Sequence, residues 1–154
     1  MPDLHFETRF SNPAETTAFA VALGQRLHAG DVILLEGDIG AGKTHFARGM
    51  IQSLLSEPED VPSPTFTLVQ VYDGPECEIW HADLYRLTDP NEAIELGLEE
   101  AFQSAICLVE WPERLATLVP ADALTLSFAV QPDDTRIMTA KGTSKWERRL
   151  RGLK

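Results

Sequence analysis

The 154-residue sequence predicts a single α/β domain over residues 1–154, in which helices flank a mixed, mostly parallel β-sheet. Two continuous apolar runs, residues 32–35 and 105–109, have the composition of strands that are buried on both faces of a parallel sheet. Segments with helical periodicity alternate with the strand-like segments, as they do in α/β domains. Near the C-terminus, two alternating segments predict a β-hairpin, and a short amphipathic segment after it predicts a terminal helix.

The N-terminal segment predicts a strand followed by a helix. Residues 4–10 alternate apolar and polar side chains, which indicates a strand with one buried face. Ser11-Asn12-Pro13 supplies a capping residue and then a proline suited to the first turn of a helix. We expect this helix to end at Gly30 and to bury one face, formed by Phe19, Leu23 and Leu27.

The middle of the chain predicts further strands and helices. After strand 32–35 and a glycine-rich loop, residues 44–55 have the periodicity of a helix, and the three prolines of residues 56–64 indicate a stiff connector. The segments expected next are strands over 65–72 and 78–83, one helix that starts at Asp89-Pro90, the strand 105–109, and hairpin strands over 123–130 and 135–141.

Composition and charge exclude several classes of protein. The chain is 44% hydrophobic and 24% charged, which excludes general disorder, and no apolar run approaches the ~20 residues of a membrane helix. The N-terminus has no secretory signal pattern, and Cys77 and Cys107 are too few for a disulfide scaffold or a cysteine-rich zinc site. We therefore expect a cytoplasmic protein without membrane attachment.

The charge is unevenly distributed. With 13 basic and 24 acidic side chains the formal net charge is −11, which argues against a broad nucleic-acid surface. Six of the basic residues lie in residues 141–154, where Glu147 is the only acid. We expect this segment to be a terminal helix that docks through Trp146 and Leu150; contact with tRNA or with a protein partner is the alternative.

The glycine-rich loop fits the pattern G-x-x-x-x-G-K-[ST] at every fixed position. Between a buried strand and an amphipathic helix, such a loop points backbone N–H groups at phosphate oxygens. Lys43 then supplies positive charge to the β- and γ-phosphates, and the Thr44 hydroxyl is a ligand for Mg²⁺. The predicted nucleotide-binding residues are Gly37, Asp38, Ile39, Gly40, Ala41, Gly42, Lys43 and Thr44.

A phosphate-binding loop needs a carboxylate near its magnesium ion, and two residues qualify. Glu110 ends the apolar run 105–109, and Asp83 ends the predicted strand 78–83. Parallel strands of an open sheet deliver their carboxyl ends to the ligand crevice, so both remain candidates.

The expected nucleotide is ATP. The chain contains no N-K-x-D motif for reading guanine, because Asn12 precedes proline and Asn91 precedes glutamate. A small P-loop kinase remains an alternative, although Arg86 is the only arginine that residues 56–113 offer for an acceptor lid. A second alternative is a nucleotide-gated assembly module in which hydrolysis is incidental.

Four motifs together closely resemble the TsaE family, also called YjeE. They occur in the family's order over nearly the whole chain, at residues 37–44, 63–69, 81–87 and 108–112. The resemblance implies a bacterial ATPase subunit needed for N6-threonylcarbamoyladenosine (t6A) in tRNAs that read codons beginning with A. It implies work with the TsaB–TsaD heterodimer, chiefly with TsaD, and contact with tRNA only through that complex. Arg48 and Arg86 are the only arginines of the expected active-site segments, and neither is placed to reach the γ-phosphate unaided, so we expect weak ATPase activity alone and activation by these partners.

The resemblance also implies roles for single residues. Thr44 and Glu110 would hold Mg²⁺, and Lys43, Asp83 and Glu110 would act in catalysis. Residues 63–68 would act as a switch segment beside the γ-phosphate, and Trp111 and Arg136 would lie near the nucleotide or the partner. Most members have a second threonine where this chain has His45. His45 could donate to a phosphate oxygen in its place, and an ordinary surface residue at the start of the helix is the alternative.

Overall fold

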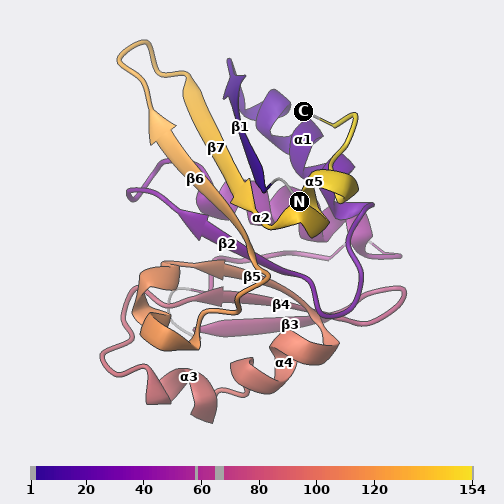
Figure 1. Cartoon of the computed structure of the whole chain (residues 1–154), viewed down its shortest axis with the longest axis vertical. Coiled ribbons are helices and arrows are strands. Elements are labelled where there is room, and N and C mark those ends of the chain that lie inside the picture. The colour runs from indigo at the N-terminus through magenta and orange to yellow at the C-terminus, as the bar shows by residue number, and fades with distance from the viewer. Residues whose placement is uncertain (1–2, 58, 65–67, 154) are drawn as a thin grey trace.

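The computed structural model describes residues 3–57, 59–64 and 68–153, and its centre is one seven-stranded sheet (Figure 1). The strand order is β1-β7-β6-β2-β5-β4-β3. The strands are β1 (Leu4–Phe10), β2 (Val32–Glu36), β3 (Val69–Asp73), β4 (Glu78–Asp83), β5 (Ile106–Glu110), β6 (Leu124–Val130) and β7 (Arg136–Gly142).

The predicted mixed sheet in a single α/β domain is confirmed. The central pairs β6–β2, β2–β5 and β5–β4 are parallel, whereas β1–β7, β7–β6 and β4–β3 are antiparallel. Parallel pairing therefore dominates only the centre, and the antiparallel pairs extend the sheet at both edges. The sheet is strongly twisted: in Figure 1 the strands β3 and β4 run nearly horizontally, whereas β1 and β7 run at a steep angle to them.

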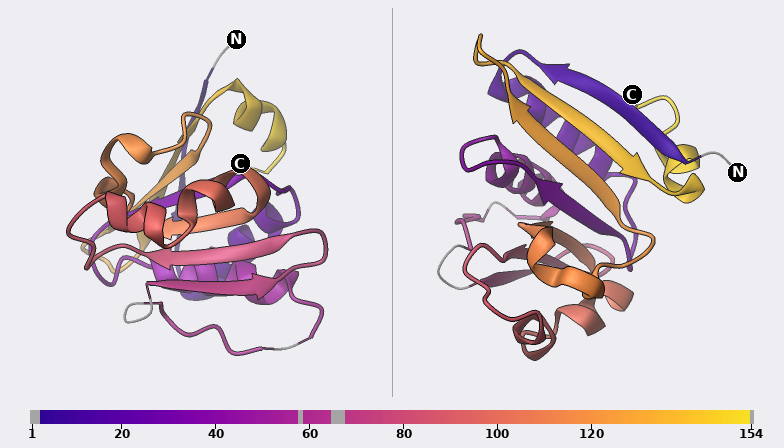
Figure 2. Two further views of the ribbon diagram at one scale, coloured as in Figure 1. Left: turned by 90° about the horizontal axis from the view of Figure 1, so that it is seen from below. Right: turned by 60° about the vertical axis from the view of Figure 1, so that its left-hand side comes forward.

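Helices cover both faces of the sheet (Figure 2). One hydrophobic core joins the sheet to α1 (Pro13–Gly24), α2 (Lys43–Leu54) and α5 (Ser144–Arg149). The second core lies under α3 (Asn91–Glu95), α4 (Leu98–Ser104) and the 3₁₀ segment η1 (Pro112–Leu118). Strand β5 is buried along its whole length between these cores, as its continuous apolar run predicts.

Two predicted helices have different bounds. The first ends at Gly24 instead of Gly30, because i→i+3 turns at Arg26 and Leu27 replace the helical bonding there, although Leu27 stays buried. The single helix expected from Asp89 is interrupted at Gly97, where φ is +87° and no right-handed helix can continue. The predicted strand 65–72 begins at Val69, and residues 65–67 lie outside the described chain.

The C-terminal hairpin and the terminal helix are confirmed. β6 and β7 pair antiparallel across the turn at residues 131–135, and Trp146 and Leu150 are both fully buried. The buried Asp31 accepts from Lys145 Nζ at 3.1 Å and from Arg149 Nη1, which ties α5 to the start of β2. The basic side chains at this end of the chain thus serve partly to dock the helix. Among the described residues, no helix combines the length and apolar composition that crossing a membrane requires.

Candidate nucleotide and metal site

The site lies where the central parallel strands end. Leu35 of β2 is paired with Glu110 of β5, and Glu110 is paired with Asp83 of β4, so both predicted carboxylates stand side by side at one sheet edge. The loop that leaves β2 crosses this edge before it enters α2. Strand order and register therefore bring together residues that lie up to 75 positions apart, as Leu35 and Glu110 do.

The loop backbone depends on its glycines. At Gly37, φ is +141° and a Cβ atom would lie 2.6 Å from the Phe128 carbonyl oxygen, so only glycine fits beside β6. Gly42 is the N-cap of α2 with φ +110°, and no side chain caps the helix. The first N–H groups of α2 are consequently available to an anion, and the helix dipole favours one there.

Lys43 is held in an unusual environment for a lysine. Its side chain is buried, Nζ donates to the Gly37 carbonyl at 2.5 Å, and Nζ lies 3.5 Å from the centre of the Trp111 ring. Burial lowers the pKa of Lys43 from its ordinary value of 10.5, while the nearby carboxylates Glu110, Glu113, Asp83 and Asp38 oppose that shift. The buried Lys43 ammonium is a positive group that can pair with a negatively charged phosphate.

Thr44 and Glu110, the residues predicted to hold Mg²⁺, are in direct contact. Thr44 Oγ1 donates to Glu110 Oε1 at 2.7 Å, and the other carboxylate oxygen, Oε2, lies 2.7 Å from His81 Nε2. Glu110 is only 2% exposed. A hydroxyl and a carboxylate are hard oxygen ligands, which suit Mg²⁺. No cluster of three or more His, Cys, Asp or Glu that could hold a metal occurs within the described ranges. In proteins, Mg²⁺ usually keeps several waters and is bound by one or two carboxylates together with substrate phosphates.

Asp83 belongs to the same cavity. It is 6% exposed, and its Oδ1 accepts from the Tyr85 backbone N–H at 3.0 Å, which fixes the carboxylate at the end of β4. The cavity has a volume of about 230 Å³. Its lining combines the predicted catalytic and metal residues with the aromatic and arginine side chains that follow β4 and β5: Ile39, Gly40, Lys43, Thr44, Asp83, Tyr85, Arg86, Glu110 and Trp111.

Trp111 lines this cavity and has a strained backbone conformation. Its φ is +60°, which is uncommon for a bulky residue, and its ring lies 4.9 Å from the Tyr85 ring and over the Lys43 ammonium. These contacts place a flat aromatic surface directly against Lys43.

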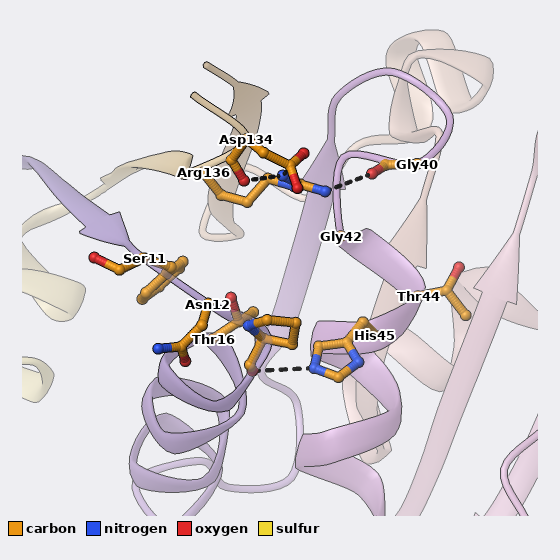
Figure 3. A pocket seen from close by; sticks show the side chains of 11 residues that line it. Ser11, Asn12, Thr16, Gly40, Gly42, Thr44, His45, Asp134 and Arg136 are labelled. Atoms are coloured by element: carbon orange, nitrogen blue, oxygen red, sulfur yellow. Dashed lines mark hydrogen bonds and ion pairs between the residues drawn. The ribbon is translucent and has the colours of Figure 1, made fainter. Parts of the chain in front are cut away.

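A larger cavity of about 400 Å³ lies on the other side of the loop (Figure 3). It is bounded by the junction of β1 with α1, by the loop and α2, and by the tip of the C-terminal hairpin; its lining residues are Phe10, Ser11, Asn12, Pro13, Thr16, Gly40, Gly42, Thr44, His45, Asp134 and Arg136. The Thr44 side chain points away from this space in Figure 3, consistent with its bond to Glu110. The loop thus separates a small acidic cavity from a larger, mostly apolar one.

His45 and Arg136 both lie in the wall of the larger cavity. His45 Nε2 lies 2.9 Å from Thr17 Oγ1 and 3.1 Å from the Pro13 carbonyl, so this nitrogen faces α1. Arg136 Nη1 donates to the Asp134 carbonyl at 2.6 Å, and Nη2 donates to the Gly40 carbonyl at 3.5 Å. Arg136 therefore joins the hairpin to the loop.

Sequence reasoning missed two parts of this region. It gave His81 no role of its own, yet His81 Nε2 lies 2.7 Å from Glu110 Oε2. It assigned Ser11-Asn12-Pro13 to helix capping alone, and Asn12 does cap α1, but the same turn also lines the larger cavity. No local pattern distinguishes these second roles.

Three comparisons with known proteins agree. Residues 10–138 match the family model described as "Threonylcarbamoyl adenosine biosynthesis protein TsaE". The chain is 39% identical to a "tRNA threonylcarbamoyladenosine biosynthesis protein TsaE" from Rickettsia bellii over 137 residues, which cover 89% of this chain and 95% of that protein. The protein of the same name from Bacillus subtilis is 39% identical over 132 residues, or 85% of this chain and 82% of the relative.

A solved structure has the same fold. The chain superimposes on the "Crystal structure of Bacillus subtilus YdiB" with a TM-score of 0.82 and 31% identity, and the match covers 99% of this chain and 96% of that one.

Proposed function

This chain belongs to the TsaE family and takes part in t6A modification of tRNA, and we propose that it does so as a Mg²⁺-dependent ATPase. The proposed ATPase domain extends over residues 1–154. The observation that supports the proposal most strongly is the contact of Thr44 with Glu110 beside the buried Lys43, at the open N-terminus of α2. Phosphate, metal and catalytic groups would meet there.

Each residue of the small cavity has a role in this proposal. Thr44 and Glu110 would hold Mg²⁺, which neutralises the phosphate charge and orients the γ-phosphate when it is bound. Lys43 binds the β- and γ-phosphates. Its Nζ either gives up the hydrogen bond to the Gly37 carbonyl or keeps that bond while it also donates to the phosphates. Asp83, fixed by Tyr85 at the end of β4, orients the attacking water.

The larger cavity would take the nucleoside. It adjoins the loop that binds the phosphates, and Phe10 and Pro13 provide apolar surface for a base. Arg136 closes its edge against Gly40, and His45 lines it where α1 meets α2. A nucleotide spanning the loop would occupy both cavities.

We propose further that TsaB–TsaD, chiefly TsaD, is the partner that completes the site, with tRNA reached only through that complex. Two residues that line the small cavity, Ile39 and Tyr85, are 74% and 43% exposed, so solvent reaches its lining. A partner surface there would exclude water from the phosphates.

Single-turnover cleavage of γ-labelled ATP, with and without TsaB–TsaD, tests this function. We expect the label to be released as free phosphate, and Lys43→Ala to slow release about 10²–10³-fold, as expected when a transition-state charge contact is lost. Lys141→Ala, which removes an exposed lysine of β7, is the control and should leave the rate unchanged. Label transferred to an acceptor would identify a kinase, and nucleotide-dependent assembly without cleavage would identify an assembly module.

A further inference from the structure

A buried hydrogen bond supports the carboxylate of Glu110 from behind. His81 Nε2 lies 2.7 Å from Glu110 Oε2, and the two side chains are 0% and 3% exposed. Because a carboxylate accepts hydrogen bonds, Nε2 carries the hydrogen and donates it. The register fixes this contact: His81 pairs with Leu108, which lies two residues before Glu110, so both side chains stand on the same face of the sheet.

The two oxygens of Glu110 consequently have different partners. Oε2 accepts from His81, and Oε1 accepts from the Thr44 hydroxyl at 2.7 Å. A glutamate side chain has three rotatable bonds, and a fixed donor on one oxygen determines where the other oxygen points. His81 thereby keeps Oε1 directed at Thr44, the second oxygen ligand of the proposed magnesium site.

We propose that His81 is a positioning residue for Mg²⁺: it holds Glu110 in the orientation that binds the ion together with Thr44. This inference rests on the proposed function, since it requires that Glu110 and Thr44 bind Mg²⁺. Hydrogen-bond partners of metal-binding carboxylates typically affect metal affinity or activity by about 10–100-fold.

Packing alone is a poor reason for a histidine at this position. Within the described part of the chain, the buried Nδ1 atom has no hydrogen-bond partner. Burying an unsatisfied polar atom costs stability, and an apolar side chain of similar size would avoid that cost. The bond from Nε2 to Glu110 is an interaction that an apolar side chain could not supply here.

Three substitutions separate positioning from packing. His81→Leu fills the space without a donor, and His81→Asn has an amide that is too short to reach Glu110. His81→Gln carries the same amide one methylene further, where its nitrogen approximates the place of Nε2. Circular dichroism spectra and thermal unfolding without nucleotide identify which variants are folded.

The measurement is the affinity of the full chain for ADP, in EDTA and over a series of Mg²⁺ concentrations. We expect His81→Asn and His81→Leu to raise the half-saturating Mg²⁺ concentration about 10–100-fold while ADP affinity in EDTA stays within about threefold. We expect His81→Gln to restore most of the Mg²⁺ response.

The contrary results are distinct. The inference is overturned if folded variants respond to Mg²⁺ as the unaltered chain does, or if His81→Gln is as impaired as His81→Asn. It is also overturned if the variants lose ADP affinity equally with and without the metal, since that marks a packing role. If either His81→Asn or His81→Leu does not fold, the other variant decides. A failure of Mg²⁺ to affect ADP binding in the unaltered chain would instead refute the proposed function itself.

Discussion

Glu110 and Asp83 are neighbours across β5 and β4, yet their contacts predict different consequences of neutralising them. Glu110→Gln weakens the bond from Thr44 and removes a metal-binding charge, so we expect a loss of Mg²⁺-dependent ADP affinity. Asp83→Asn leaves that pair intact and should lower single-turnover rate more than affinity. Calorimetric ADP affinity and rapid-quench rates, measured on both variants, check this division; equal effects of the two variants on affinity would contradict it.

The buried ammonium of Lys43 predicts proton uptake on nucleotide binding. In the free protein, burial holds the pKa of Lys43 below 10.5, and bound phosphates would raise that pKa because they favour the charged form. ADP affinity should therefore fall as the pH rises through the lowered pKa toward 10.5, with net proton uptake in that window. Titration calorimetry in buffers of different ionisation enthalpy measures the uptake.

Lys43→Arg is the control for this pH effect, because arginine stays protonated throughout the window. It should abolish the proton uptake whatever its effect on affinity. The same lowered pKa has a consequence for folding: the unfolded chain binds the proton more tightly, so Lys43 should add stability as the pH rises from the native pKa to 10.5. If ADP binding to Lys43→Arg still takes up a proton in this pH range, a group other than Lys43 is responsible.

The loop residues could be placed from the sequence because their motif specifies a backbone shape as well as side chains. Gly37 and Gly42 have the positive φ angles that such a loop needs, and Lys43 and Thr44 follow directly at the helix start. His81 could not be assigned, because one polar residue in a strand says nothing about which carboxylate the neighbouring strand will bring beside it.

The docking of α5 is a feature of whole elements and can be tested through Asp31. This buried carboxylate joins Lys145, Arg149 and the His28 backbone N–H, so Asp31→Asn should lower the free energy of unfolding by about 1–3 kcal/mol. Asp133→Asn is the matched control: Asp133 pairs with Arg9 on the exposed surface and should change stability little. Urea unfolding of both variants decides, and similar midpoints for the two would contradict the anchoring role.

Element types were predictable and several element ends were not. Helix α1 ends at Gly24, where the space for a side chain is already occupied by Met50 of α2, at 2.9 Å from a Cβ position. The helix expected from Asp89 is interrupted at Gly97, which is the N-cap residue of α4 and lies beside the Trp80 ring. In both places a glycine lies close to a residue of another element, and no window of local sequence contains that contact.

At the scale of the whole molecule, the order of the strands was the least predictable feature. The hairpin β6–β7 lies between β1 and β2, which brings Arg136 and Asp134 to the loop after β2 and builds the larger cavity. Strand propensity and periodicity predict neither this strand order nor the pairing of β1 with β7 of the hairpin. The smaller cavity was more predictable, because parallel strands deliver their ends to one edge by rule.

Partner activation is the prediction that concerns the whole molecule in its complex. Arg48 donates to the Val61 carbonyl at 2.9 Å, whereas Arg86 lines the small cavity, so Arg86 is the arginine that a partner could press toward the γ-phosphate. Steady-state phosphate release should rise about tenfold or more with TsaB–TsaD, because an arginine that reaches the γ-phosphate accelerates hydrolysis by about 10³–10⁵-fold in P-loop proteins. Arg86→Ala should blunt this rise, and Arg148→Ala, on the exposed side of α5, should not. Turnover of several per second by the isolated chain, unchanged by the partners, would refute activation.

The most direct test of the proposed site is a crystal structure of the chain with ADP and Mn²⁺, in which anomalous scattering locates the metal. We predict the phosphates on the N–H groups between Gly40 and His45, and the metal bound to Thr44 Oγ1 with Glu110 reaching it directly or through one water. A metal remote from both Thr44 and Glu110, or an ADP that does not contact the loop, would contradict the proposed nucleotide and magnesium site.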